Sequence, residues 1–417
     1  MKFMPIKKID KLVLNDSLVK DYLEYLKIRI EFLLNRFNKY KDFPGVQTGY
    51  NSITGEEFSK EDIYSYSWIN GRGLCVFVRF SDNFPSYKVP LLEFAAHVVS
   101  HMKKQWEINN HHFPFIANLD GTEKDVGCTC PDGYKSYSDL YACNGLIEYG
   151  SRLKDREYIK MAKKIFKEIV KSLENNQFIS EPDPIPDDRL FENPWSCTVD
   201  LANEFTKHLD DTQYTDTGAR LIEYLLNNFY FEELGVYVEY ITPDGDLFVD
   251  DKDRYTVDPG HSIEFCSFCL EFCRLAESKN LHKKLCERIK KVIPGLLIWN
   301  VKNGWNKNHP GIYKTIDVKT GDPINSTMPW WILPETMLAI ILAYERDRKD
   351  KYLDMFKEVH NAYFINYMNP LTDFGSYQNI NGATGKPADI IPACKFQDPE
   401  FHSGKNILTI TEVIRRL

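Results

Sequence analysis

Residues 156–173, REYIKMAKKIFKEIVKSL, place their apolar side chains at the spacing of a single helix face. Recurrence of apolar residues at three, four and seven positions is typical of an amphipathic helix that buries one side. Residues 219–230, ARLIEYLLNNFY, repeat the pattern. In the first segment the apolar face consists of Tyr158, Ala162, Ile165, Phe166, Ile169, Val170 and Leu173. Helices therefore dominate the predicted structure.

The same periodicity predicts twelve helices along the chain. Their expected ranges are 15–40, 66–81, 88–108, 136–152, 155–175, 195–209, 213–230, 260–277, 279–299, 332–346, 350–365 and 402–416. The links after the even-numbered helices are short, whereas the other links are long and rich in turn-forming residues. Within one long link, YVEYITPDGDLFV at 237–249 predicts a β-hairpin, because alternating residues flank Pro-Asp-Gly.

This alternation of short and long links indicates how the helices pack. A short link forces two successive helices to lie antiparallel as neighbours. Six such pairs closed into a ring would form an (α/α)6 barrel, with alternate helices inside and outside and all the long loops at one end. We therefore expect an all-α fold with a single domain over residues 1–417. An open helical solenoid is the alternative, although the chain shows no repeat of fixed period.

The composition argues against several classes of protein. With 43% hydrophobic and 27% charged residues, the chain resembles an ordinary globular protein. Its net charge of −8 and its lack of a long basic run disfavour a nucleic-acid or anionic-membrane partner. No stretch of about 18 apolar residues could span a bilayer. The opening residues MKFMPIKKIDKLVL lack the apolar core of a signal peptide, so we expect a cytoplasmic protein.

The ten cysteines do not suggest a disulfide framework in a chain of 417 residues. Cys266, Cys269 and Cys273 recur at i, i+3 and i+7, which is one face of a helix. A metal could use that face, but buried free thiols that pack as small apolar side chains explain the spacing more simply. We predict no metal site.

Residues that a hydrophobic core would not require are concentrated on the even-numbered helices, close to the expected long-loop end. They are Trp68, Arg72, Trp195, Asn203, His261, Glu264, Trp330, Trp331, Glu335 and His402. In a closed barrel these residues would converge on one pocket, although they are scattered along most of the chain. Their convergence favours a functional site over isolated structural roles.

The chemistry of His261 follows from its place in the sequence DPGHSIE. Asp258 is a good N-cap and Pro259 suits the first helical position, which puts His261 in the first turn. The positive end of the helix dipole disfavours the imidazolium there. We therefore expect the neutral ring that a general base requires. Glu264 lies on the same face, where it could orient the ring or bind a substrate hydroxyl. A histidine that only packs in the first turn is the alternative.

Arg72 lies between Gly71 and Gly73, whose small size would leave room for a ligand to approach. A guanidinium suits a carbonyl or a developing oxyanion, and an ordinary ion pair is the alternative. The adjacent Trp330 and Trp331 could stack on a sugar ring or simply pack in the core.

Four motifs together resemble the N-acylglucosamine 2-epimerase family, which includes cellobiose 2-epimerases and aldose–ketose isomerases. The motifs are WINGRGLCVF at 68–77, DPGHSIE at 258–264, MPWWILPETMLAIILAYE at 328–345 and FHSGKN at 401–406. They extend from Trp68 to beyond His402, so the resemblance covers nearly the whole chain. It implies an (α/α)6 barrel, which agrees with the pattern of helices and links.

The resemblance also implies roles for individual residues. His261 and His402 would be the two catalytic histidines, and Arg72 would bind near the carbonyl oxygen and C2 of an opened sugar. Glu264 would support His261, and Glu335 would lie in the wall of the pocket. The substrate-binding residues that we expect are Trp68, Asn203, Trp330, Trp331 and Glu335. The implied reaction is proton abstraction at C2 through an enediolate, which requires neither a metal nor a redox cofactor.

The chain departs from the family pattern near the expected pocket. Cys75 stands where the family often has Trp, Glu400 precedes the aromatic residue of the last motif, and Lys405 follows it. These departures leave the sugar open, as well as the choice between epimerisation and isomerisation. Some family members bind ATP as an activator, but the Gly-rich NGATGK at 381–386 lacks P-loop spacing. Dimers are common in the family, so a homodimer is also open.

Two other functional classes remain as alternatives. An (α/α)6 glycoside hydrolase would need two carboxylates that face each other across the pocket, and Glu264 with Glu335 is the pair that we would nominate. The other is a non-catalytic carbohydrate-binding or scaffold protein on the same barrel.

Overall fold

A computed structural model describes residues 4–59, 64–125, 130–389 and 397–417. All twelve predicted helices are present in this part of the chain. They are α1 (Asp16–Lys39), α2 (Ser67–Asn83), α3 (Lys88–Ile108), α4 (Tyr137–Leu153), α5 (Arg156–Glu174), α6 (Asn193–His208), α7 (Thr212–Asn228), α8 (Pro259–Ser278), α9 (Lys283–Gly304), α10 (Ile332–Asp347), α11 (Lys351–Ala362) and α12 (Gly404–Arg416). Three short helical segments of other types lie in the links: the 3-10 helices η2 (Pro85–Tyr87) and η4 (Pro370–Thr372) and the π-helix η3 (Tyr363–Tyr367).

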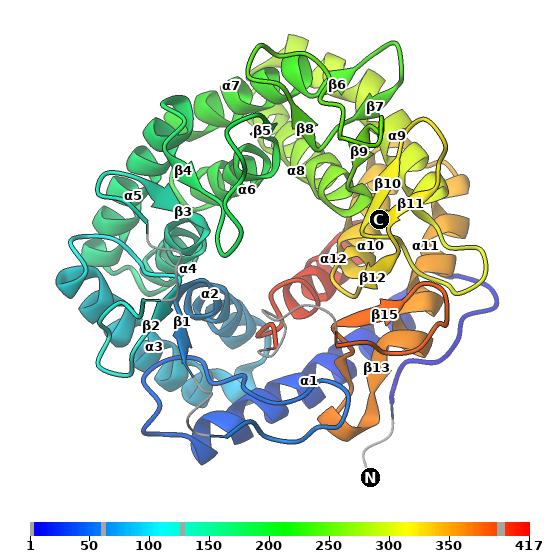
Figure 1. The fold of residues 1–417 in the computed structure, drawn as a ribbon. Helices are drawn as coiled ribbons and strands as arrows, with labels where there is room; N and C mark the ends of the chain where they lie inside the picture. Colours follow the sequence, from blue (N-terminus) through cyan, green and yellow to red (C-terminus); the bar gives the residue numbers. More distant parts are fainter. Residues whose placement is uncertain (1–3, 60–63, 126–129, 390–396) are drawn as a thin grey trace.

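The helices close into a ring of two layers (Figure 1). The even-numbered helices form the inner layer, in which each helix packs on the next and α12 returns to α2. The odd-numbered helices form the outer layer. This arrangement confirms the predicted (α/α)6 barrel and excludes an open solenoid. That residues 1–417 fold as one domain stays a prediction.

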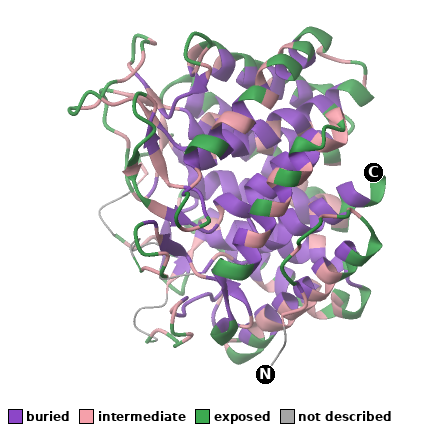
Figure 2. Cartoon of the chain, turned by 90° about the vertical axis from the view of Figure 1, so that its right-hand side faces the viewer, coloured by how far each residue is buried: buried purple, intermediate pink, exposed green. Residues whose placement is uncertain are grey.

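The burial pattern explains which helices lie inside. On α5 the buried residues are Ala162, Ile165, Phe166, Ile169, Val170, Ser172 and Leu173, so one face packs inward and the other meets water. By contrast, α4 is buried without interruption from Tyr137 to Gly150. A helix that is buried on every side belongs to the interior of a protein. Figure 2 shows the buried inner helices and the long connections gathered at one end of the barrel.

Short strands within the long links cover that end. They are β1 (Ser65–Tyr66), β2 (Ile116–Ala117), β3 (Lys135–Ser136), β4 (Phe178–Ile179), β5 (Leu190–Phe191), β6 (Tyr230–Phe231), β7 (Val236–Tyr237), β8 (Tyr240–Ile241), β9 (Thr256–Val257), β10 (Thr315–Asp317), β11 (Pro323–Asn325), β12 (Thr327–Pro329), β13 (Met368–Asn369), β14 (Gly375–Ser376) and β15 (Asn379–Asn381). Most pair as antiparallel two-stranded ribbons, and β9, β10 and β11 form a three-stranded sheet.

The hairpin predicted at 237–249 is only partly correct. A tight turn does form, in which Gly245 N donates to Thr242 O at 2.9 Å. Its arms share a single bridge between Ile241 and Leu247, because β8 pairs instead with β5, where Leu190 lies opposite Ile241. This pairing joins the loop before α6 to the loop before α8.

Gly71 serves helix packing rather than ligand approach, which corrects the prediction. A Cβ at Gly71 would lie 2.2 Å from the carbonyl oxygen of Tyr141, and one at Gly145 would lie 2.4 Å from that of Gly71. The two glycines therefore let α2 and α4 approach backbone to backbone. A Cβ at Gly73 would likewise meet Val46, at 2.6 Å.

Two other predictions can be compared with the structure. Cys266, Cys269 and Cys273 are fully buried in the barrel and free, as expected for thiols that pack as apolar side chains. Within the described residues, no helix combines the length and the apolar character that a bilayer crossing requires.

Candidate active site

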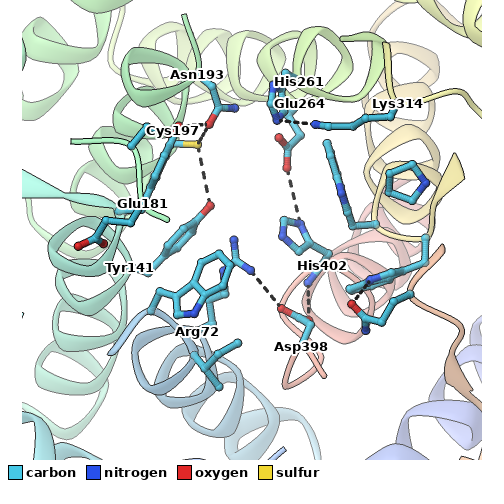
Figure 3. Close-up of a pocket in the computed structure, with 18 of the residues that line it drawn as sticks. Arg72, Tyr141, Glu181, Asn193, Cys197, His261, Glu264, Lys314, Asp398 and His402 are labelled. Carbon is cyan, nitrogen blue, oxygen red and sulfur yellow. Dashed lines mark hydrogen bonds and ion pairs between the residues drawn. The ribbon is translucent and has the colours of Figure 1, made fainter. Parts of the chain in front are cut away.

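A cavity of about 310 Å³ opens inside the ring at the long-loop end (Figure 3). Seven of the predicted site residues line it: Trp68, Arg72, His261, Glu264, Trp330, Trp331 and His402. The other lining residues are Ile69, Tyr137, Tyr141, Ser180, Glu181, Phe191, Asn193, Cys197, Lys314, Pro329, Gln378 and Asp398. The structure thus brings together residues from the inner helices α2, α4, α6 and α8 and from the loops above the ring.

His261 occupies the first turn of α8, as predicted. Asp258 caps the helix, and its Oδ1 accepts from the backbone N–H groups of Gly260 at 2.8 Å and His261 at 3.2 Å. The imidazole stacks on the indole of Trp331 with 5.5 Å between ring centroids. Gly260 permits this contact, since a Cβ there would lie 2.5 Å from the indole.

The predicted neutral state of His261 is wrong. Its Nδ1 lies 2.9 Å from Glu239 Oε1 and 3.4 Å from Asp258 Oδ2. Burial alone would lower the pKa of His261, but the carboxylates of Asp258 and Glu239 outweigh it and raise the pKa to about 9. Two carboxylates at close range therefore override the helix dipole, and the ring is an imidazolium at neutral pH.

Not every charge around His261 favours this state, because the ammonium of Lys314 lowers the pKa of His261 and the carboxylates outweigh it. Lys314 forms an ion pair with Asp258, and its Nζ lies 3.4 Å from Nε2 of His261. Burial, followed by repulsion from Glu239, raises the pKa of Glu192 to about 8, so its carboxyl is mostly protonated at neutral pH. The two remaining carboxylates then balance Lys314 and a protonated His261.

Glu264 does not support His261, contrary to the prediction. Its Oε1 lies 3.6 Å from Nδ1 of His402, and Figure 3 shows its carboxyl between the two histidines. Burial and then repulsion from Glu335 raise the pKa of Glu264 well above its usual value. Glu239 takes the position next to His261 instead. It belongs to the loop before β8, where no sequence motif indicated it.

His402 lies in a tight turn just before α12. Its Nδ1 is 2.7 Å from Glu335 Oε1, and its backbone N–H donates to Asp398 Oδ2 at 3.3 Å. Burial lowers the pKa of His402 well below its usual value, and the nearby cation of Arg72 lowers it further. The ring is therefore neutral. A carboxylate on Nδ1 favours the tautomer that leaves the Nε2 lone pair free.

Glu335 lies behind His402 rather than in the wall of the cavity, which corrects its predicted place. Burial raises the pKa of Glu335 to about 7, against the opposing effect of Lys405. The carboxyl thus ionises near neutral pH, where it can accept the hydrogen bond from Nδ1 of His402.

The two histidines face the same space. His402 lies against the indole of Trp331 with 5.7 Å between ring centroids, and His261 stacks on the same indole. Trp330 meets the edge of His402 at 5.8 Å and donates from Nε1 to Gln378 at 3.2 Å. Figure 3 shows both histidines among the side chains that line the cavity.

Arg72 projects into the cavity from α2. Its guanidinium carbon lies 4.0 Å from the ring centroid of Tyr141 and 4.9 Å from that of Trp68. Its Nη1 is 3.6 Å from Asp398 Oδ1. The aromatic rings therefore hold the guanidinium in place at the wall of the cavity, where its charge can act on a ligand.

Asn203 does not reach the cavity, and Asn193 takes its expected place. Asn203 lies about 15 Å further along α6, where its Nδ2 donates to Phe268 O at 3.0 Å. Asn193 begins α6, and its Oδ1 accepts from Tyr137 at 2.5 Å. Trp195 is also absent from the cavity lining and stacks on Tyr224 at 4.0 Å. The start of α6 was the sequence signal that could have identified Asn193.

Comparisons with known proteins agree with this architecture. A sugar epimerase from a ruminal bacterium superposes with a TM-score of 0.75 at 16% identity, covering 96% of this chain and 99% of that one. The cellobiose 2-epimerase from Spirochaeta thermophila superposes with a TM-score of 0.75 at 15% identity, covering 97% of this chain and 99% of that one. A D-mannose isomerase superposes with a TM-score of 0.73 at 11% identity, covering 98% of this chain and 100% of that one. At these identities the likeness shows the fold.

Sequence comparison supplies the family. No curated protein sequence matches the chain significantly. The family model described as N-acylglucosamine 2-epimerase (GlcNAc 2-epimerase) matches residues 155–397, which is more than half of the chain. This match confirms the resemblance found in the sequence motifs and the predicted class of enzyme, an isomerase. The chain belongs to the N-acylglucosamine 2-epimerase family.

Proposed function

We propose that the protein is a sugar 2-epimerase that acts on the opened form of a reducing sugar. One observation carries this proposal: His261 and His402 line one cavity and contact the same indole of Trp331, and their neighbours shift the two pKa values in opposite directions. A pair of titratable groups whose environments separate their pKa values is the arrangement expected of a base and an acid.

The reaction follows from these states. Nε2 of His402 removes the proton from C2, and the electron pair moves through C1 to the carbonyl oxygen, which gives an enediolate. His261 then delivers its proton to the opposite face of C2, and the carbonyl re-forms. In the reverse direction the two histidines exchange roles. A single base on one face could not easily invert C2.

Arg72 and Glu264 support the intermediate. Arg72 is 9% exposed, and its guanidinium lies among aromatic rings, so its charge would stabilise an enediolate oxygen more strongly than it would in water. Burial raises the pKa of Glu264 well above its usual value, which favours the protonated carboxyl that can donate to a sugar hydroxyl.

The same enediolate can also lead to a ketose, if the proton returns to C1 instead of C2. The structural likeness to both a cellobiose 2-epimerase and a D-mannose isomerase supports proton transfer at C2 as the shared chemistry. The presence of two histidines directed at one space favours epimerisation.

The hydrolase alternative receives no support from the geometry. Oxygens of Glu264 and Glu335 lie within 4.8 Å of each other and of His402, so both acids sit on the same side of the cavity. A glycoside hydrolase places its two carboxyl groups roughly 5–9.5 Å apart on either side of the scissile bond.

The proposed steps use this chain's own residues and no cofactor. Residues 381–386, considered for ATP, form a tight turn in which Gly385 N donates to Asn381 O at 2.8 Å. Gly382 packs against the residue before β12, since a Cβ at Gly382 would lie 2.2 Å from Ser326 O. The turn therefore offers no evident phosphate cradle. ATP activation, a homodimer and a cytoplasmic location all stay predictions.

Hydrogen exchange into a sugar tests the proposal. The protein is incubated in D2O with a panel of reducing mono- and disaccharides and followed by proton NMR. We expect deuterium at C2 of at least one sugar together with the appearance of its 2-epimer. The variants His261→Ala and His402→Ala should lose conversion by a factor of about 10²–10⁴, while His97→Ala, a histidine outside the cavity, should keep it. Conversion without exchange, or no exchange with any sugar, would overturn the proposal.

A further inference from the structure

Arg29 is an unusual residue for an outer helix. It belongs to α1, yet it is only 2% exposed. Its Nε donates to Glu400 Oε1 at 2.7 Å. Its Nη1 donates to the backbone oxygens of Thr372 at 2.5 Å and Asp373 at 3.0 Å. One guanidinium thus ties α1 to two loop segments that lie more than 340 positions away.

Strained backbone is concentrated around this guanidinium. Glu400 has a φ of 67°, Asp373 of 50° and Phe374 of 64°. Side chains other than glycine rarely adopt these left-handed conformations. Such strain persists only where the surrounding structure imposes it, and it tends to occur at functional sites. Arg29 contacts the strained segments on both sides.

Glu400 connects Arg29 to the turn that presents His402. Its carboxylate accepts from Ser403 Oγ as well as from Arg29. Its backbone oxygen accepts from Lys405 N, in the first turn of α12, at 2.9 Å. His402 lies between these two anchored residues. A change in the Arg29–Glu400 pair would therefore move the backbone from which the imidazole projects.

We propose that Arg29 and Glu400 form a positioning clasp, which holds the turn at 398–404 so that His402 meets its substrate carbon in the geometry needed for proton transfer. The inference rests on the proposed function of His402. Glu400 is one of the residues at which the sequence departs from the family pattern, so the clasp is assigned to this chain.

The clasp depends on the shape of arginine as well as its charge. The fork of donors reaches the carboxylate and the two carbonyl groups together, which a lysine ammonium cannot do. Gly375 leaves space for it, since a Cβ there would lie 2.9 Å from Nη2 of Arg29. Arg29→Lys therefore keeps the charge and removes the fork.

Kinetics provide the first test. Trp68 does not contact the clasp. Arg72 meets Asp398 and Phe401 of the turn, but the rings of Tyr141 and Trp68, which lie outside the turn, also hold its guanidinium. Misplacement of a reacting group by about 1 Å costs roughly 10²-fold in rate. We expect Arg29→Lys and Glu400→Gln each to lower kcat by about 10- to 100-fold with little change in KM. The double variant should be no slower than the worse single variant, because both changes break one contact.

Arg36 provides a matched control. It lies on the same helix, is 6% exposed, forms an ion pair with Glu57 at 2.8 Å and donates to Gln47 O at 3.1 Å. These contacts do not involve the turn at 398–404. Arg36→Lys should keep kcat within about twofold of wild type, measured on protein shown by circular dichroism to be folded.

A second readout does not depend on turnover. Nitrogen-15 NMR of the histidines reports the Nδ1–H of His402, which bonds to Glu335. We expect this signal to shift or broaden in Glu400→Gln and Arg29→Lys, and to stay unchanged in Arg36→Lys. An unchanged signal in all three variants, or additive losses of kcat in the double variant, would overturn the clasp. Absence of C2 exchange in the wild-type protein would instead overturn the proposed function. The NMR measurement would still test whether Arg29 and Glu400 position His402.

Discussion

His261 and His402 are the same type of residue in one cavity, and their neighbours give them opposite charges. Carboxylates of Asp258 and Glu239 surround His261 and raise its pKa to about 9. Burial, Arg72 and Lys405 all lower the pKa of His402. The motifs contain Asp258, Arg72 and Lys405 but not Glu239, and they do not show which charge meets which ring. Only the structure therefore distinguishes the acid from the base.

The pH dependence of kcat/KM should therefore be bell-shaped. Activity should rise with pH through about 7, as Glu335 ionises and holds Nδ1–H of His402. It should fall as the pH rises through about 9, where His261 loses the proton that it donates. A pH–rate profile of kcat/KM reports these groups in the free enzyme. A profile that rises without a falling limb up to pH values above 9 would contradict the assignment of His261.

Glu239→Gln sharpens this prediction. The carboxylate of Glu239 lies 2.9 Å from Nδ1 of His261. Its loss should lower the pKa of His261, so that the falling limb of the profile moves to lower pH by about 1–3 units. Glu192→Gln is the matched control, because its carboxyl, 3.8 Å from the same atom, is already mostly protonated below its pKa of about 8. Equal shifts in the two variants would show that the carboxylate of Glu239 does not raise the pKa of His261.

At the scale of elements, helices were predictable and their contacts were not. The apolar periodicity of segments such as 156–173 located each helix within a few residues, because one buried face imposes a 3.6-residue repeat. The strand pairing of β8 with β5 depends on residues about 50 positions apart, so a local pattern predicted a hairpin instead. Gly71 was likewise misinterpreted from its sequence neighbours, because its role in packing depends on the backbone of α4.

Close packing of α2 on α4 leads to a stability prediction. Gly71→Ala places a methyl group 2.2 Å from a backbone oxygen that cannot yield easily. We expect the free energy of unfolding to fall by about 1–3 kcal/mol or more, seen as a lower urea midpoint. Gly295→Ala is the control, because a Cβ at this exposed position in α9 meets nothing within 4 Å. That change should raise stability by about 0.5–1 kcal/mol, since alanine favours the helix. Equal effects of the two changes would exclude the packing explanation.

At the scale of the whole molecule, ring closure creates the site. His261 and His402 lie on α8 and on the turn before α12, and they meet only because α8, α10 and α12 are successive members of the inner layer. The alternation of short and long links predicted this convergence, since it sends every long loop to one end. It could not predict how far along a helix the cavity extends, which is why Asn203 was expected in the site and Asn193 was not.

The most direct measurement of the central claim is hydrogen exchange at C2 in single-histidine variants. His261→Asn and His402→Asn are each incubated in D2O with either epimer of the substrate, at a pH near 9, about the pKa of His261. If the histidines act on opposite faces of C2, each variant will exchange the C2 hydrogen of one epimer only, the two variants will choose different epimers, and neither will interconvert them. Exchange of the same epimer by both variants, or continued epimerisation by either one, would contradict the account.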